Sequence, residues 1–388
     1  MRALLRLCWL SLLTVAISSC GIFGGEEEAN PPAELVKFKA TLKVRKAWSA
    51  GVGEKTEYLR LALVPASDGA RVFAAGHDGR VSAFEVERGK RLWTRKTKLP
   101  LSAGPAVGGE WVVVGTSDGD VLALNADDGN ERWKVSVSSE VLAAPVVAQA
   151  RDLVLVRTVD GKLIALDAFT GNEIWFVQQS VPRLSVRGTG SPIIAGETVI
   201  CGFDNGKVAA YALADGSLLW EALINPPSGR TEVERLADLN AAVRVAGENV
   251  YVTGYQGTVA AVDLQQGQVV WAQEVSSYDA PAVDLTQIYV AAASGELHTL
   301  ARGTGQELWR DGTLLNRSLT GPAAFGNSVV VGDFDGYLHW FDAATGQLQA
   351  RTRAGSHAIV AAPLVVNDLL LVLNDGGKLY AFRESGSK

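Results

Sequence analysis

The chain has 388 residues, of which 47% are hydrophobic and 20% charged, with a formal net charge of −6. This acidic balance argues against nucleic-acid binding, which requires a basic surface. Of the three cysteines, Cys8 and Cys20 lie in the first 20 residues, so Cys201 is alone in the rest of the chain. We therefore expect a body that folds without an intramolecular disulfide, which a domain of this size can do through apolar burial.

Residues 1–19 have the order of a secretory signal. Arg2 and Arg6 precede the apolar run 7–17, which is too short for the roughly 20 residues of a membrane-spanning helix. The stretch Ile17-Ser18-Ser19-Cys20 resembles the lipobox of bacterial lipoproteins, in which the cysteine is acylated. That resemblance implies lipidation of Cys20 and, with Gly21 next to it, a lipid anchor at the periplasmic face of the outer membrane. The alternative is an ordinary signal peptide with an incidental cysteine.

Residues 20–40 are predicted to be the lipidated cysteine and a flexible tether. Glycine, like charges and proline follow one another in Gly24-Gly25, Glu26-Glu27-Glu28 and Asn30-Pro31-Pro32. Such a composition opposes packing. The folded body, residues 41–388, should therefore hang close to the membrane.

The body repeats itself in one register. A turn-forming pair ends in glycine at Gly79, Gly119, Gly161, Gly206, Gly257, Gly295, Gly336 and Gly377. Ten residues after the first seven of these stands another glycine, at Gly89, Gly129, Gly171, Gly216, Gly267, Gly305 and Gly346. Four residues further on is a tryptophan in every copy except the last, which has Ala350.

Each repeat is interpreted as four short strands. In the second repeat we expect an inner strand from Ala106, then strands over 111–114, 121–124 and 131–137. Asp118-Gly119 suits a two-residue hairpin, because such turns need the positive φ that Asp and Gly tolerate. No segment shows helical periodicity.

Four-stranded units of about 40 residues are typical of a β-propeller. We therefore predict an all-β fold, an eight-bladed β-propeller of antiparallel blades. The eighth unit ends before its fourth strand, whereas Trp48 precedes the first complete unit. The segment 42–50 should supply the missing strand and close the ring, which protects sheet edges.

The repeated tryptophans are interpreted as structural. An indole can cover a neighbouring blade while its N–H reaches a backbone acceptor. Ala350 should then mark the weakest seam. The docking residues predicted in this way are Trp48, Trp93, Trp133, Trp175, Trp220, Trp271 and Trp309.

The stretches 165–175, ALDAFTGNEIW, and 123–133, ALNADDGNERW, resemble the tryptophan-docking repeat of the quinoprotein propellers. Together with the lipobox, the length and the blade count, they resemble the BamB family, lipoproteins of the β-barrel assembly machinery (BAM complex). The resemblance implies a scaffold that assists insertion of outer-membrane proteins, a monomer within a hetero-complex. Its expected partners are BamA, through its POTRA region, and other subunits of that complex.

The resemblance also places the partner site. The distance between successive turn glycines is greatest at the third and fourth junctions, and loops longer than a connection needs are candidates for function. In the BamB family such loops bind BamA, and the family's motif apolar–Ser–apolar–Arg–Gly maps onto residues 184–188. Its acidic companion maps onto residues 235–240, where Asn240 replaces a second acidic residue. The implied partner-binding residues are Leu184, Ser185, Val186, Arg187, Arg235, Asp238 and Asn240. The alternative is that both loops are solvated connectors.

Enzymatic activity is not expected, although quinoprotein dehydrogenases use the same repeats. Those enzymes typically have a calcium or lanthanide ion, a catalytic aspartate and, in many members, vicinal cysteines. Here Cys201 stands alone in a strand-like sequence and should be buried, and the four histidines show no metal-ligand spacing. We predict no catalytic residues, no metal and no cofactor; the alternative is a periplasmic quinone (PQQ) enzyme or ligand-binding propeller. A further possibility is that blade edges pair with extended strands of unfolded outer-membrane proteins.

Overall fold

The computed structural model describes residues 30–55, 62–185, 190–227, 230–231, 233, 236, 238–239 and 241–385. In these ranges the regular structure is β-strand, apart from one 3-10 turn, η1 (Gln149–Arg151). Within the same ranges, no helix has the length and apolar character needed to cross a membrane.

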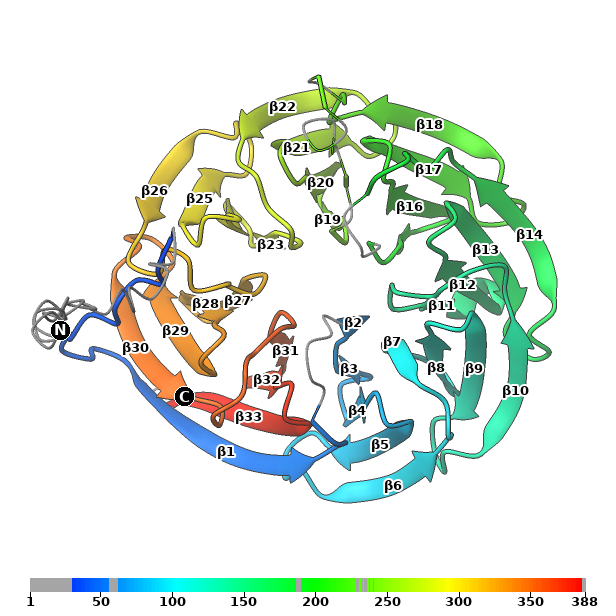
Figure 1. Cartoon of the computed structure of the whole chain (residues 1–388), viewed down its shortest axis with the longest axis horizontal. Helices are drawn as coiled ribbons and strands as arrows, with labels where there is room; N and C mark the ends of the chain where they lie inside the picture. The colour runs from blue at the N-terminus through cyan, green and yellow to red at the C-terminus, as the bar shows by residue number, and fades with distance from the viewer. Residues whose placement is uncertain are drawn as a thin grey trace, which may run out of the picture.

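The strands form eight sheets arranged as blades around a ring (Figure 1), which confirms the predicted eight-bladed propeller. Chain order runs from the inner to the outer strand of each blade, except that the outer strand of the eighth blade, β1, comes from the start of the chain. The first four blades comprise β3 (Ala66–Ser67), β4 (Arg71–Ala75), β5 (Arg80–Glu85) and β6 (Arg91–Lys96); β7 (Leu101–Gly108), β8 (Trp111–Thr116), β9 (Asp120–Asn125) and β10 (Glu131–Ser136); β11 (Val146–Ala148), β12 (Leu153–Arg157), β13 (Lys162–Asp167) and β14 (Glu173–Gln178); and β15 (Ile193–Ala195), β16 (Thr198–Gly202), β17 (Lys207–Ala212) and β18 (Leu218–Leu223).

The remaining blades follow the same order. They comprise β19 (Arg244–Ala246), β20 (Asn249–Thr253), β21 (Thr258–Asp263) and β22 (Val269–Glu274); β23 (Ala282–Val283), β24 (Gln287–Ala291), β25 (Leu297–Ala301) and β26 (Glu307–Asp311); β27 (Ala323–Phe325), β28 (Ser328–Gly332), β29 (Tyr337–Asp342) and β30 (Leu348–Arg353); and β31 (Leu364–Val366), β32 (Leu369–Leu373), β33 (Lys378–Ser385) and β1 (Lys43–Gly51). A short strand, β2 (Ala62–Leu63), also pairs in parallel with β7.

Burial differs sharply between the strands of one blade. Every residue of β8 is buried, because neighbouring blades cover both faces of the middle strands. In the outer strand β10 only Trp133 is buried, and its neighbours are exposed apart from the half-buried Val135. The core therefore lies between the blades, in the middle strands.

The ring is closed by the two ends of the chain, as predicted. Strand β1 pairs antiparallel with β33, and Trp48 lies opposite Ala381. Figure 1 shows this pair side by side at the outside of the eighth blade. This pairing covers the edge of β33, which would otherwise be free.

Each repeated tryptophan joins its own blade to the next one. The indole lies against the second repeated glycine of that next blade; a Cβ atom added to Gly171, for example, would stand 2.7 Å from Trp133. These glycines also have positive φ, 73° at Gly171. The indole nitrogens donate to carbonyl oxygens of the next blade: Trp48 to Val86 (2.8 Å), Trp93 to Ala126 (2.9 Å), Trp133 to Ala168 (2.7 Å), Trp175 to Leu213 (3.1 Å), Trp220 to Leu264 (2.9 Å), Trp271 to Arg302 (3.1 Å) and Trp309 to Ala343 (2.9 Å).

The seam at Ala350 is built differently, for a topological reason. The third and fourth strands of the eighth blade, β33 and β1, come from opposite ends of the chain, so they are not joined by the turn that connects these strands in the other blades. The space is filled by Trp340, which is fully buried and meets the Phe382 ring edge-on at 6.2 Å, with Leu42 and Val44 packed beside them. Ala350 therefore faces a packed cluster and leaves no open gap.

Residues 31–42, here called the strap, differ from the flexible tether that was expected through residue 40. The Ala33 amide donates to the Leu315 carbonyl (2.9 Å), and the Thr41 amide donates to the Gln349 carbonyl (3.0 Å). Composition indicated disorder, but it contains no information about partners some 300 residues away. The signal peptide, Cys20 and the first part of the expected tether lie outside the described residues.

Replacement of Trp133 by alanine tests the docking geometry. The change removes a buried indole and its hydrogen bond to Ala168, and it leaves a cavity between the second and third blades. We expect the free energy of unfolding to fall by about 3–5 kcal/mol in urea titrations. The exposed Leu308, changed to alanine in the same way, should lower it by less than about 1 kcal/mol; equal losses would contradict this role of the indole.

Candidate partner-binding surface

Two long inter-blade loops flank the fourth blade. The first connects β14 to β15 and the second connects β18 to β19. Both begin beside the hairpin turn of their own blade: the Gln179 amide donates to the Gly161 carbonyl (3.0 Å), and the Asn225 amide donates to the Gly206 carbonyl (3.1 Å). The repeated turn glycines thus place the start of each loop on one end of the ring.

The far ends of the two loops meet. A Cβ atom on Gly190, at the end of the first loop, would lie 2.4 Å from the carbonyl oxygen of Ala241, at the end of the second. A Cβ on Gly202 of β16 would lie 2.5 Å from the Leu239 carbonyl oxygen. Only glycine permits these approaches, and they bring two loops that are far apart in sequence onto one surface over the fourth blade.

Part of the predicted site is visible on this surface. Leu184 is 42% exposed and Val181 38% exposed, and Ser185 is half-buried. The second loop presents Val233 to solvent. Val186, Arg187, Arg235 and Asn240 lie outside the described residues.

Asp238, one of the implied partner-binding residues, is buried. Asp238 is only 1% exposed, and its backbone carbonyl oxygen accepts a hydrogen bond from the Tyr255 amide (3.2 Å). The next residue, Leu239, packs in the core between the fourth and fifth blades. Burial of this apolar anchor draws Asp238 inward with it. Asp238 therefore belongs to the base of the loop.

An aromatic pair beside this loop was missed from the sequence. The Tyr255 and Tyr278 rings stack with centroids 4.4 Å apart, and Asn225 donates to the Tyr255 carbonyl (3.1 Å). Tyr278 is partly exposed. Both residues lie in connections of ordinary length, so loop length gave no signal. A tyrosine directly before the turn pair Gln256-Gly257, where most repeats have a small or polar residue, was the available sign.

The outer rim of the ring is unequal. On blades three to five the outer strands present apolar side chains that are each 47–53% exposed: Ile174, Phe176, Leu218, Leu219, Leu223, Val269 and Val270. The matching strand of the second blade, β10, exposes Glu131, Arg132 and Lys134 instead. Charged residues on an edge strand oppose pairing with another strand, and apolar ones do not. The exposed apolar side chains therefore lie on the same blades that the two long loops connect.

Among the described residues, no group of three or more His, Cys, Asp or Glu side chains could hold a metal ion. The Cys201 thiol is fully buried in β16, and burial raises its pKa. Nearby, Arg157 and Asp204 form a buried ion pair (3.4 Å); burial raises the pKa of Asp204, and the charge of Arg157 opposes that effect. This pair joins the third and fourth blades.

The comparisons with known proteins agree with this architecture. The profile of the family described as "Outer membrane protein assembly factor BamB" matches residues 77–311 and 293–388. A protein of that name from Xanthomonas campestris is 41% identical over 97% of both chains. The crystal structure of BamB from Moraxella catarrhalis superimposes with a TM-score of 0.81 at 26% identity, covering 88% of this chain and all of the other.

A second kind of neighbour shares the fold alone. A quinohemoprotein alcohol dehydrogenase from Pseudomonas putida superimposes with a TM-score of 0.70, covering 90% of this chain and 77% of the enzyme, at 14% identity. The family profile and the full-length relative carry the assignment. The chain belongs to the family of the outer membrane protein assembly factor BamB.

Proposed function

We propose that this chain is a non-catalytic scaffold of the outer-membrane β-barrel assembly machinery and binds BamA through the two loops over its fourth blade. Its relatives are named outer membrane protein assembly factors, which supports a role in assembly at the outer membrane. The observation that carries the finer proposal is the contact between Gly190 and Ala241, which joins the two loops into one surface. In this proposal Cys20 is lipidated, and the chain is a monomer within a hetero-complex.

The exposed residues suit a protein partner. Interfaces are centred on apolar and aromatic side chains with a polar rim. Val181, Leu184 and Val233 provide exposed apolar groups, and the stacked Tyr255 and Tyr278 lie beside the second loop. These residues come from four connections between strands, which together span the fourth and fifth blades.

Replacement of Leu184 and Arg187 by alanine tests the loop surface. Leu184 is exposed, so its loss should leave the fold and its urea midpoint unchanged. We expect the affinity for BamA to fall by about tenfold or more, because a few central side chains carry most of an interface. The measurement is recovery of BamA with the tagged chain from detergent-solubilised membranes.

Leu308 and Arg310 form the matched control. They present the same residue types on β26 of the sixth blade, two blades away from the fourth. The double alanine variant at these positions should recover BamA as the unchanged chain does. Full recovery with the Leu184 and Arg187 variant would contradict the proposed surface.

A second binding mode is favoured by the apolar rim of blades three to five. An extended strand can hydrogen-bond to an exposed sheet edge, and apolar side chains can then pack across the pair. Unfolded outer-membrane proteins contain extended segments that can pair in this way. We infer that these edges receive them before insertion.

Photo-crosslinkers at Leu219 and Val270 test this mode. Both positions point outward from edge strands, so a paired precursor strand would lie within reach. We expect crosslinks to newly exported barrel precursors at these positions and none above background at Arg132 and Lys134 of β10. Silence at all four positions, or equal labelling, would contradict the edge-pairing mode.

The non-catalytic role has its own test. Purified chain incubated with pyrroloquinoline quinone and calcium should show no saturable quinone binding and no alcohol-dependent dye reduction. The fold it shares with the dehydrogenase makes this measurement necessary. Saturable binding with dye reduction would instead favour the quinone-enzyme alternative.

A further inference from the structure

The strap follows one path along the seventh blade. Pro31 and Ala33 lie on the connection between β26 and β27, where Asn316 donates to the Pro31 carbonyl (3.2 Å). Leu35 packs against the core cluster of the sixth and seventh blades. The strap then runs beside the outer strand β30 and continues into β1, as the blue segment in Figure 1 shows.

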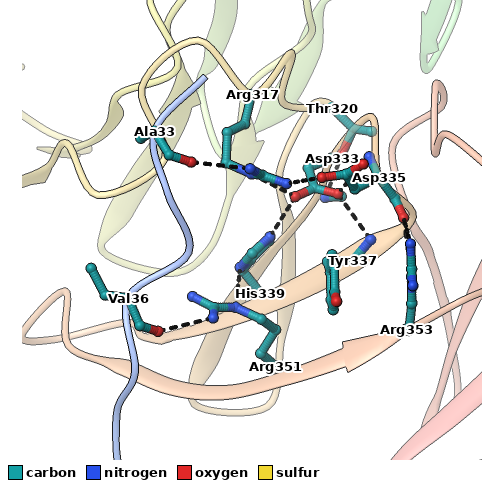
Figure 2. Close-up of polar contacts among 11 residues, drawn as sticks. Ala33, Val36, Arg317, Thr320, Asp333, Asp335, Tyr337, His339, Arg351 and Arg353 are labelled. Carbon is teal, nitrogen blue, oxygen red and sulfur yellow. Dashed lines mark hydrogen bonds and ion pairs between the residues drawn. The ribbon is translucent and has the colours of Figure 1, made fainter. Parts of the chain in front are cut away.

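Arg317 binds the first part of the strap at Ala33. Its side chain is buried, and one guanidinium nitrogen donates to the Ala33 carbonyl (3.0 Å). The other two nitrogens bind Asp333 (2.8 Å) and Asp335 (2.6 Å). Figure 2 shows these contacts converging on the turn between β28 and β29. Two carboxylates thus fix the guanidinium that captures the strap.

Arg351 holds the middle of the strap in the same way. One terminal nitrogen donates to the Val36 carbonyl (3.0 Å), and the guanidinium lies over the Phe38 ring at 5.2 Å. Its Nε atom contacts His339 Nδ1 (3.2 Å), and the opposite ring nitrogen, Nε2, contacts Asp333 (3.0 Å). The strap is therefore connected to a buried histidine through a single side chain (Figure 2).

The contacts of His339 define its protonation state. The Arg351 Nε–H is always a donor, so His339 Nδ1 must accept and cannot carry a proton. Nε2 then carries the hydrogen and donates it to Asp333. A second proton would place an N–H of His339 against the N–H of Arg351, and Arg351 would have to move away from Val36.

The electrostatic surroundings act in the same direction. Burial lowers the pKa of His339; Asp333 opposes this, whereas the charges of Arg351 and Arg317 lower it further. The Tyr337 ring is the remaining polar neighbour on its strand, at 6.2 Å. Departure of Arg351 would remove one of the two positive charges, so His339 binds a proton more readily when the strap is free.

We propose that His339 and Arg351 form a pH-sensitive latch, which holds the strap on the seventh blade while His339 is neutral and releases it when His339 is protonated. The held form should dominate at neutral and higher pH. It loses stability as pH falls below about 6.5, the ordinary histidine value. Because one proton is taken up, the opening equilibrium can rise by at most about tenfold for each pH unit.

Release of the strap would lengthen the stretch of chain between the lipid and the ring. If Cys20 carries the lipid, as proposed above, the first residue after it that is fixed to the ring is Pro31 in the held form and Lys43 in the released form. At up to 3.6 Å for each extended residue, the maximum reach grows from roughly 40 Å to roughly 80 Å. This consequence depends on lipidation, whereas the latch itself does not.

Amide hydrogen exchange of the full mature chain in detergent tests the latch. The reporters are the hydrogen-bonded amides of Ala33, Thr41 and Leu42. After correction for intrinsic exchange rates, we expect their protection to fall by about tenfold between pH 7.5 and 5.5, while amides of β28 and β29 stay protected. Equal strap protection at both pH values would overturn the proposal, as would loss of protection throughout the blade.

Three variants separate the latch from a general effect of acid. His339→Gln can donate and accept without titrating, so its strap protection should not depend on pH; an unchanged pH dependence would overturn the proposal. Arg351→Lys keeps a charge but loses the fork, and the strap should exchange about tenfold faster at pH 7.5. Arg353→Gln is the control on the same strand, since Arg353 binds the Asp335 carbonyl and should behave as the unchanged chain.

Discussion

The docking of each outer-strand indole on the next blade is the interaction that the rest of the structure depends on. A blade by itself would leave both faces of its middle strands in water. The tryptophan covers one side of the junction, a glycine with positive φ provides the flat place that receives it, and a carbonyl oxygen accepts the indole N–H. Repetition of this joint, with the pairing of β1 and β33, forces the sheets into a closed ring.

A closed ring of equivalent joints leaves function to the places where the repeats differ. The two long loops converge over the fourth blade, the outer strands of blades three to five are apolar, and the strap lies on the seventh. The first two features share blades three to five and the strap lies elsewhere on the ring, so a partner on the fourth blade and a membrane link at the seventh would not compete for space. The ring therefore keeps the proposed partner contact and the proposed membrane link on different blades.

The seam at Ala350 shows that a departure from the repeat can be packed in another way. The missing tryptophan predicts a weak joint, and the strands that meet here, β33 and β1, come from the two ends of the chain. Trp340 and Phe382 fill the space from other strand positions. On the binding surface, the family motif implied that Asp238 contacts the partner, whereas the structure buries it next to Leu239, which packs in the core.

The sequence by itself determined the blade count, the strand order, the hairpin turns and the closing role of residues 42–50, because these follow from local turn chemistry and from a pattern repeated eight times. It also located the two long loops. Only the tertiary structure decided that Gly190 meets Ala241, that Asp238 is buried, and that the strap is held by Arg317 and Arg351. These contacts join residues far apart in the chain and are made by side chains outside the repeat, so no periodicity could reveal them.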